Sequence, residues 1–223
     1  EILRHKIMHQ WMVDGVDIPC TDGVMIADTV QIGTGTTILP GTILLGNTTI
    51  GKDCLIGPNT YIMDGTVGNG VTLDNVKLTD STVEDGADAG PFVQIRGGSV
   101  LHTGVHIGDF VEVKNSTVGA GTKSAHLTYI GDSDVGAGVN FGCGTVTVNY
   151  DGKNKSRCKI GDGAFIGCNT NLVAPVEVGD RAYIAAGSTI TDDIPGDALS
   201  IARARQVNKP GWVTEKKPYK EKK

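Results

Sequence analysis

The 223-residue sequence predicts an all-β fold, a parallel β-helix of six-residue repeats. The chain holds 32 glycines, only 5% of its residues are aromatic, and an aliphatic residue recurs every six positions from Ile32 onward. Abundant glycine with few aromatics disfavours an ordinary layered domain and favours tight turns. A helix would show a period of 3.6 and an alternating strand a period of 2, so a period of six indicates a short strand, a corner and another short strand. Three such units close one triangular coil.

The repeat extends over nearly the whole chain, and we assign residues 21–201 to the β-helix. Its positions are Ile32, Ile38, Leu44, Ile50, Ile56 and Ile62, then, after one spacing of five, Val67, Leu73, Leu78, Val83, Ala89, Ile95, Leu101, Ile107, Val113, Val118, Ser124, Ile130, Val135 and Phe141, and finally Ile160, Ile166, Leu172, Val178, Ile184 and Ile190. Each coil buries its aliphatic residue only when it stacks on its neighbours, so the pattern predicts one continuous core.

Short segments flank the repeats. Leu3, Ile7 and Trp11 have helical i, i+4, i+8 spacing, so residues 1–20 are expected to form a linker helix, over residues 1 to about 12, and a lead-in. Residues 202–223 are expected to form an irregular basic tail. The tail contains Arg203, Arg205, Lys209, Lys216, Lys217, Lys220, Lys222 and Lys223. Because the chain begins with Glu1 rather than Met, we expect a piece of a longer protein or a trimmed product.

Composition narrows the possible environments and partners. The formal net charge is −5, and the basic tail is more simply explained as a solvated chain end than as a nucleic-acid site. The five cysteines are Cys20, Cys54, Cys143, Cys158 and Cys168. Their odd number and wide spacing predict neither a disulfide framework nor a zinc site, which favours a reducing cytoplasm. There is no apolar run of about 18 residues and no signal peptide, so neither a membrane span nor export is expected.

Two cations are predicted to stack on successive coils. Arg96 and Lys114 are 18 residues apart, which is three repeat units. Neighbouring strands lie about 5 Å apart, where like charges repel by about 3 kcal/mol at an effective dielectric near 20. Two solvated surface cations are one interpretation. The other is a phosphate clamp, in which a bound dianion converts the repulsion into attraction.

A histidine and a carboxylate are expected nearby. Counting repeats places Glu112 and Tyr129 at equivalent positions of consecutive coils, on a face that should also carry His126. A carboxylate beside an imidazole fixes its tautomer and raises its basicity, as for a general base. A structural histidine is the alternative interpretation.

The period breaks once, at residues 149–155. This segment, Asn149-Tyr150-Asp151-Gly152-Lys153-Asn154-Lys155, is rich in turn residues and should emerge as a loop at the corner beside Arg96 and Lys114. Loops on rigid scaffolds often carry function. If the site catalyses acyl transfer, the Asn149 side chain or the loop amides are candidate hydrogen-bond donors to the oxyanion of the tetrahedral intermediate.

Four segments carry a family resemblance. They are Asp109-Phe110-Val111-Glu112-Val113-Lys114, His126-Leu127-Thr128-Tyr129-Ile130-Gly131-Asp132, Thr147-Val148-Asn149-Tyr150-Asp151-Gly152 and Ala174-Pro175-Val176. In order and spacing they resemble the acetyltransferase half of the bacterial bifunctional N-acetylglucosamine-1-phosphate uridyltransferases/glucosamine-1-phosphate acetyltransferases, in the hexapeptide-repeat acyltransferase superfamily. The likeness extends from about residue 2 to Trp212.

The resemblance implies a left-handed β-helix and a homotrimer with sites between subunits. It also implies transfer of the acetyl group of acetyl-CoA, as co-substrate, to the amine of glucosamine 1-phosphate. The product, N-acetylglucosamine 1-phosphate, would serve UDP-N-acetylglucosamine and cell-wall precursor synthesis. No metal or tightly bound cofactor is implied. No Gly-rich nucleotide loop precedes the repeats, so uridylyl transfer is not expected of these residues.

The resemblance also implies residue roles. His126 would be the general base, with Glu112 as its orienting carboxylate. Binding of the sugar phosphate would involve Arg96, Lys114, Tyr129, Asn140 and Lys155. Acetyl-CoA would contact Cys143, Cys168, Ala186, Arg203 and Lys209, with Asn149 and Tyr150 lining the reacting centre and Lys155 and Lys209 reaching across a subunit boundary. Cys143 and Cys168 stand where the family more usually has alanine and serine, and Arg96-Gly97-Gly98 replaces Arg-Pro-Gly.

Three alternatives stay open. The same scaffold could acetylate another amino sugar or sugar nucleotide. A metal enzyme of the γ-carbonic-anhydrase kind needs three converging histidines, but His102, His106 and His126 do not share a column. A non-catalytic scaffold would lack the cations and the histidine, which are present here.

Overall fold

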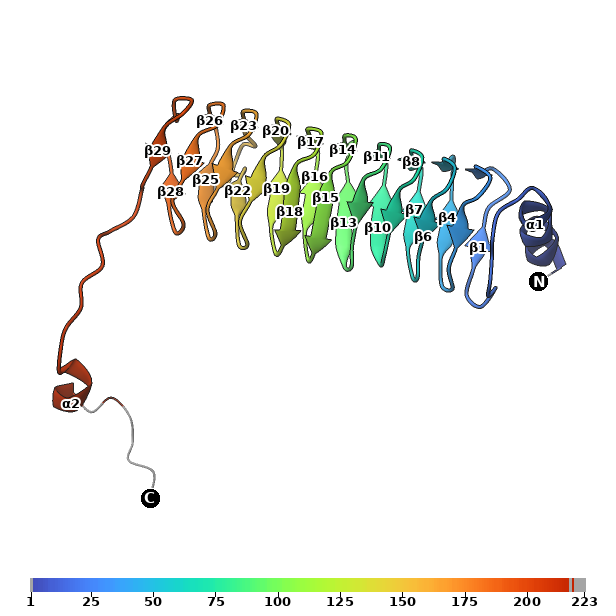
Figure 1. Ribbon diagram of the computed structural model, residues 1–223, viewed down its shortest axis with the longest axis horizontal. Helices are drawn as coiled ribbons and strands as arrows, with labels where there is room; N and C mark the ends of the chain where they lie inside the picture. Colours follow the sequence, from blue (N-terminus) through green and yellow to red (C-terminus); the bar gives the residue numbers. More distant parts are fainter. Residues whose placement is uncertain (1, 217, 219–223) are drawn as a thin grey trace, which may run out of the picture.

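The computed structural model describes residues 2–216 and 218. The chain winds into a parallel β-helix of about ten coils, left-handed as predicted, and the coils stack along one axis (Figure 1). Each coil contributes one short strand to each of three sheets, and every paired strand within these sheets runs parallel to its partner. The six-residue period therefore predicted the architecture correctly.

The three sheets contain ten, nine and ten strands. The first sheet consists of β1 (Met25–Ile26), β4 (Ile43–Leu45), β7 (Tyr61–Met63), β10 (Val76–Thr79), β13 (Val93–Arg96), β16 (Glu112–Lys114), β19 (Tyr129–Gly131), β22 (Val146–Val148), β25 (Asn171–Val173) and β28 (Thr189–Ile190). The second consists of β2 (Gln31–Ile32), β5 (Thr49–Ile50), β8 (Thr66–Val67), β11 (Thr82–Val83), β14 (Val100–Leu101), β17 (Thr117–Val118), β20 (Ser133–Val135), β23 (Cys158–Ile160) and β26 (Val176–Val178). The third consists of β3 (Thr37–Ile38), β6 (Leu55–Ile56), β9 (Thr72–Leu73), β12 (Asp88–Ala89), β15 (His106–Asp109), β18 (Lys123–His126), β21 (Asn140–Phe141), β24 (Phe165–Ile166), β27 (Tyr183–Ile184) and β29 (Leu199–Ser200).

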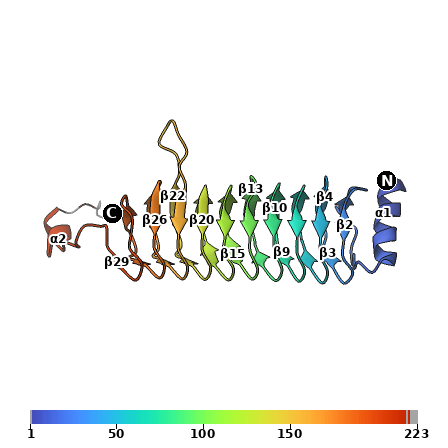
Figure 2. The same cartoon turned by 90° about the horizontal axis from the view of Figure 1, so that it is seen from above.

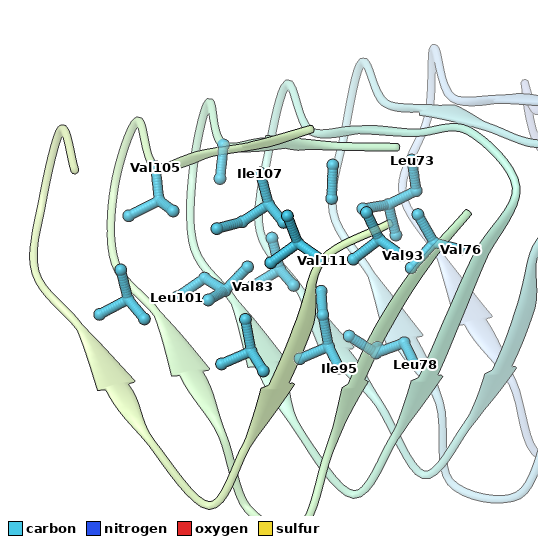
Figure 3. Packing of buried hydrophobic residues seen from close by; sticks show 14 of the residues in the cluster. Leu73, Val76, Leu78, Val83, Val93, Ile95, Leu101, Val105, Ile107 and Val111 are labelled. Atoms are coloured by element: carbon cyan, nitrogen blue, oxygen red, sulfur yellow. The ribbon is translucent and has the colours of Figure 1, made fainter. Parts of the chain in front are cut away.

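The core is the column of repeat residues inside the coils. Every predicted repeat position from Ile32 to Ile190 is buried, and Figure 3 shows several of these side chains stacked between the sheets. A buried aliphatic side chain contributes about 1.5–3 kcal/mol when it leaves water. Between Phe141 and Ile160 the repeat position is taken by Thr147, whose buried hydroxyl accepts a hydrogen bond from the Gly131 amide at 2.7 Å. The rod is therefore a rigid scaffold on whose outer faces any site must lie.

A helix covers the N-terminal end of the rod. α1 spans Ile2–Val13, close to the predicted range, and lies against the first coil (Figure 1). Ile7 and Trp11 pack against the core as the spacing predicts, and Met8 is 1% exposed. Leu3, however, is exposed, so only part of the predicted apolar spacing is used for packing. The described helices include none that is both long and apolar enough to cross a bilayer.

The opposite end leads into the basic tail. Residues 201–216 are exposed, and the tail runs away from the last coil (Figure 1). A short helix, α2 (Trp212–Lys216), interrupts the tail that was expected to be irregular. The predicted basic residues Lys217, Lys220, Lys222 and Lys223 lie outside the described residues.

The predicted insertion is a loop between β22 and β23 that projects from the rod (Figure 2). The coil containing it is longer than its neighbour: 25 residues separate the strand partners Asp134 and Lys159, against 17 for Thr117 and Asp134. Because the loop follows Val148, it emerges at the corner between the first and second sheets, as expected.

Candidate functional site

The stacked cation pair lies on the first sheet. Arg96, the last residue of β13, is the strand partner of Lys114, the last residue of β16, so the predicted stacking is confirmed. The Arg96 guanidinium bonds Glu112 Oε1 through Nε at 2.8 Å and Nη2 at 2.6 Å, and Lys114 Nζ lies 3.4 Å from Asp132 Oδ2. Each cation is thus paired with a carboxylate, and these pairs offset the repulsion between Arg96 and Lys114 that the sequence predicts. Donors remain, because an arginine carries five N–H groups and a lysine three.

Tyr129 lies on the coil after that of Lys114, in the same sheet. It starts β19 and is the strand partner of Glu112, as predicted. Its ring covers Gly131: a Cβ at Gly131 would come within 2.3 Å of the tyrosine hydroxyl oxygen. Glycine at this position therefore lets the ring lie along the strand. The hydroxyl then accepts a hydrogen bond from Asn149 Nδ2 at 3.3 Å, which connects the first sheet to the base of the loop.

Asp132 joins this cluster, and no spacing argument had singled it out. Its carboxylate accepts hydrogen bonds from Asn115 Nδ2 at 2.5 Å and from Asn149 Nδ2. Burial acts to raise the pKa of Asp132, but these bonds and the nearby Lys114 ammonium outweigh burial and hold the pKa below its ordinary value. Asp132 therefore stays ionised at neutral pH. Only the tertiary structure shows that these amides and this ammonium converge on one carboxylate.

The loop is held by its own hydrogen bonds. Asp151 accepts the amides of Lys153 at 2.7 Å and Asn154 at 2.6 Å, an Asx turn, and Tyr150 forms a bridge with Lys155. The Tyr150 and Lys155 side chains are exposed, whereas Asn149 is 9% exposed. Both Asn149 N–H groups face partners within the chain, Asp132 and Tyr129. The Asn149 side chain is therefore not available as an oxyanion donor.

His126 lies on a different sheet from the cations. It is the last residue of β18, in the third sheet, and it is exposed at the corner that leads to Tyr129. The expectation that His126 shares a face with Glu112 and Tyr129 is wrong, because repeat counting does not say where a strand ends and a corner begins. The Glu112 carboxylate bonds Arg96 instead. Asn140 is also on the third sheet, as the strand partner of Lys123 and Phe165.

A column of small exposed residues continues from His126 along the corner between the third and first sheets. Its members at successive coils are Cys143, Cys168 and Ala186. The amide of Asn169 donates to the Cys143 carbonyl and that of Gly187 to the Cys168 carbonyl, both at 2.8 Å, which sets this register. At the far end the Arg203 side chain lies over Gly187, where its Cδ would be 3.6 Å from an added Cβ. Lys209 lies further along the exposed tail.

Among the described residues, the cysteines form no disulfide. All five cysteines are free, with Cys143 and Cys168 exposed. Burial raises the pKa of Cys158 to about 11 and also raises that of Cys54. Within residues 2–216 and 218 no three His, Cys, Asp or Glu side chains are grouped as metal ligands.

Comparison with known proteins identifies hexapeptide transferases. A family model described as bacterial transferase hexapeptide (six repeats) matches residues 157–192, and one described as hexapeptide repeat of succinyl-transferase matches residues 47–75. Proteins named bifunctional protein GlmU are similar over nearly the whole chain. That from Geobacillus sp. (strain WCH70) is 55% identical over 213 residues, 96% of this chain and 46% of that protein. That from Halalkalibacterium halodurans is 50% identical over 216 residues, 97% and 48% respectively.

The chain thus spans about half the length of the curated relatives it matches. Among solved structures, UDP-N-acetylglucosamine acyltransferase from Francisella novicida superposes with a TM-score of 0.54 at 16% identity, over 83% of this chain and 66% of that one. At this identity the similarity concerns the fold alone.

Proposed function

We propose that this chain transfers the acetyl group of acetyl-CoA to the amine of glucosamine 1-phosphate, because nearly its whole length is similar to proteins named bifunctional protein GlmU and two of its segments match hexapeptide transferase models. The observation that carries the proposal is the column from His126 through Cys143, Cys168 and Ala186 to Arg203. Small side chains leave room for the pantetheine arm of CoA, and Arg203 supplies positive charge for its phosphates.

The acceptor fits the cation pair on the adjoining face. The remaining N–H groups of Arg96 and Lys114, with the Tyr129 hydroxyl, suit a sugar phosphate. Phosphate binding away from the amine would position the amine against the acetyl carbon, so that binding energy promotes the reaction. Lys155 and Lys209 would contribute from a neighbouring chain, because Lys155 is exposed on a loop that projects from the rod and Lys209 is exposed on the tail.

The proposed reaction is direct attack. The neutral amine forms a C–N bond to the thioester carbonyl carbon, and the C–S bond breaks to release the CoA thiolate. His126 takes the proton that the amine loses and passes it to the thiolate, giving CoA and the N-acetyl sugar. Since the Asn149 N–H groups are engaged, amides of the loop backbone are the oxyanion donors that we propose.

The functional test is a comparison of amines. Acetyl-CoA consumption should be fast with glucosamine 1-phosphate and much slower with glucosamine, which lacks the phosphate that the cations bind. A preference for a sugar nucleotide would support the alternative acceptor class. No consumption with any amine would support a non-catalytic scaffold and overturn the proposal.

We also propose a homotrimer. Phe92, Phe110 and Leu127 line the corner beside His126, each 58% exposed, with φ of 60°, 58° and 39°. Bulky residues rarely adopt positive φ, and the two rings stack at 5.3 Å. A contiguous apolar corner of this kind suits contact with another copy of the chain. Light scattering should show trimers, and dilution to monomers should abolish activity; a fully active monomer would contradict a shared site.

The two exposed cysteines, Cys143 and Cys168, provide a test of the proposed acetyl-CoA path. An alkylating reagent near pH 8 should modify Cys143 and Cys168 first and inactivate the enzyme, while Cys54 and Cys158 stay unmodified because burial raises their pKa. CoA should protect Cys143 and Cys168 but not Cys20, as read by mass spectrometry. Equal protection of Cys20 would contradict the path. Free thiols also fit the reducing cytoplasm that we propose as the location.

A further inference from the structure

Asp132 is an enclosed anion at the base of the loop. Its side chain is 5% exposed, and it follows β19 with a φ of 48°. Its amide donates to the Lys114 carbonyl at 2.9 Å, and its carbonyl accepts the amide of Cys158 at 3.1 Å. The backbone of Asp132 thus connects the coil of Lys114 to the strand that follows the loop. Its carboxylate is held in place on both sides.

The carboxylate determines which way the Asn149 amide points. An ionised carboxylate only accepts hydrogen bonds, so the group of Asn149 that faces Asp132 must be the amino group. The same amino group donates to the Tyr129 hydroxyl at 3.3 Å. Asn115 Nδ2 holds the other carboxylate oxygen at 2.5 Å, which prevents the carboxylate from turning away. Asn149 therefore has its carbonyl oxygen left as the free polar atom.

We infer that Asp132 is a positioning residue that makes Asn149 present a carbonyl oxygen, rather than an N–H group, to the substrate amine. The inference rests on the proposed acetyl transfer. A carbonyl oxygen accepts one N–H of a neutral amine and leaves the nitrogen lone pair directed at the thioester carbon. A reversed amide would donate to that lone pair and oppose attack. Asp132 itself touches no reacting atom.

The test compares two aspartates in equivalent backbone positions. Asp132→Asn removes the charge while keeping a residue suited to positive φ. Asp80→Asn is the matched control: Asp80 directly follows β10 of the same sheet with a φ of 46°, and it is exposed. We expect Asp132→Asn to lower kcat about 10- to 100-fold, as for loss of a charged hydrogen bond, with unchanged KM for acetyl-CoA. Asp80→Asn should match the wild type.

A double-mutant cycle separates positioning from general damage. If Asp132 acts through Asn149, Asp132→Asn combined with Asn149→Ala should be no slower than Asn149→Ala alone. If the double variant instead shows the product of the two single losses in kcat, the inference is overturned. Should Asp132→Asn fail to fold, Asn115→Ala, which frees the carboxylate, enters the same cycle and must show the same non-additivity.

An activity-independent measurement distinguishes this inference from the proposed function. The side-chain amide signals of Asn149, assigned by their loss in Asn149→Ala, should exchange slowly with water in the wild type and in Asp80→Asn, and rapidly in Asp132→Asn. Slow exchange in Asp132→Asn would overturn the inference. A wild type that leaves glucosamine 1-phosphate unacetylated would overturn the proposed function, while the exchange experiment would still decide whether Asp132 orients Asn149.

Discussion

Replacing His126 with alanine is expected to lower kcat by about 10²- to 10⁴-fold, the usual effect of losing a general base. The side chain is exposed at a corner and contributes nothing to the buried core, so the change should leave the coils intact. His106→Ala is the matched control, because His106 is on the same sheet with its Nδ1 2.6 Å from Asp88 and has no role in the proposed reaction. Steady-state kinetics and light scattering on both variants provide the measurements.

The pH dependence gives the stricter criterion. For the wild type, kcat/KM should rise with pH, because both the imidazole and the substrate amine must lose a proton before attack. In His126→Ala the inflection of the imidazole should disappear while that of the amine remains. Near-full activity of His126→Ala would show that the base is another group, and the fold assignment would be unaffected.

Replacing either clamp cation, in Arg96→Ala or Lys114→Ala, should remove a charge-assisted contact of about 1.5–3 kcal/mol and so lower kcat/KM for glucosamine 1-phosphate about 10- to 150-fold. Affinity for acetyl-CoA should not change, since the proposed CoA path follows another corner. Lys77→Ala is the control, because Lys77 lies on the same sheet, over the Tyr61 ring. Equal losses toward both substrates would indicate a damaged coil.

Glu112→Gln distinguishes two roles for that carboxylate. Its bonds to Arg96 predict a change in KM for the sugar phosphate, because the guanidinium loses its anchor. A role as the orienting partner of His126 predicts instead a shifted imidazole inflection with KM unchanged. Measuring the pH profile and both KM values of this variant decides between them.

The repeat by itself determined a large part of the structure. A period of six specifies which side chains point inward and which residues of successive coils are neighbours, because each coil must bury its aliphatic residue against the next. The burial of the positions from Ile32 to Ile190, the pairing of Arg96 with Lys114 and of Glu112 with Tyr129, and the emergence of the loop after Val148 all follow from counting. The resemblance added the handedness.

Tertiary structure alone decided how the outward side chains pair. Outward residues face no periodic constraint, so their contacts depend on rotamers, on corner geometry and on where each strand ends. Counting therefore placed His126 on the wrong face and assigned Glu112 to it rather than to Arg96. Asp132 was missed for the same physical reason: its amide partners come from the preceding coil and from the inserted loop, and no repeat relates an insertion to the coils around it.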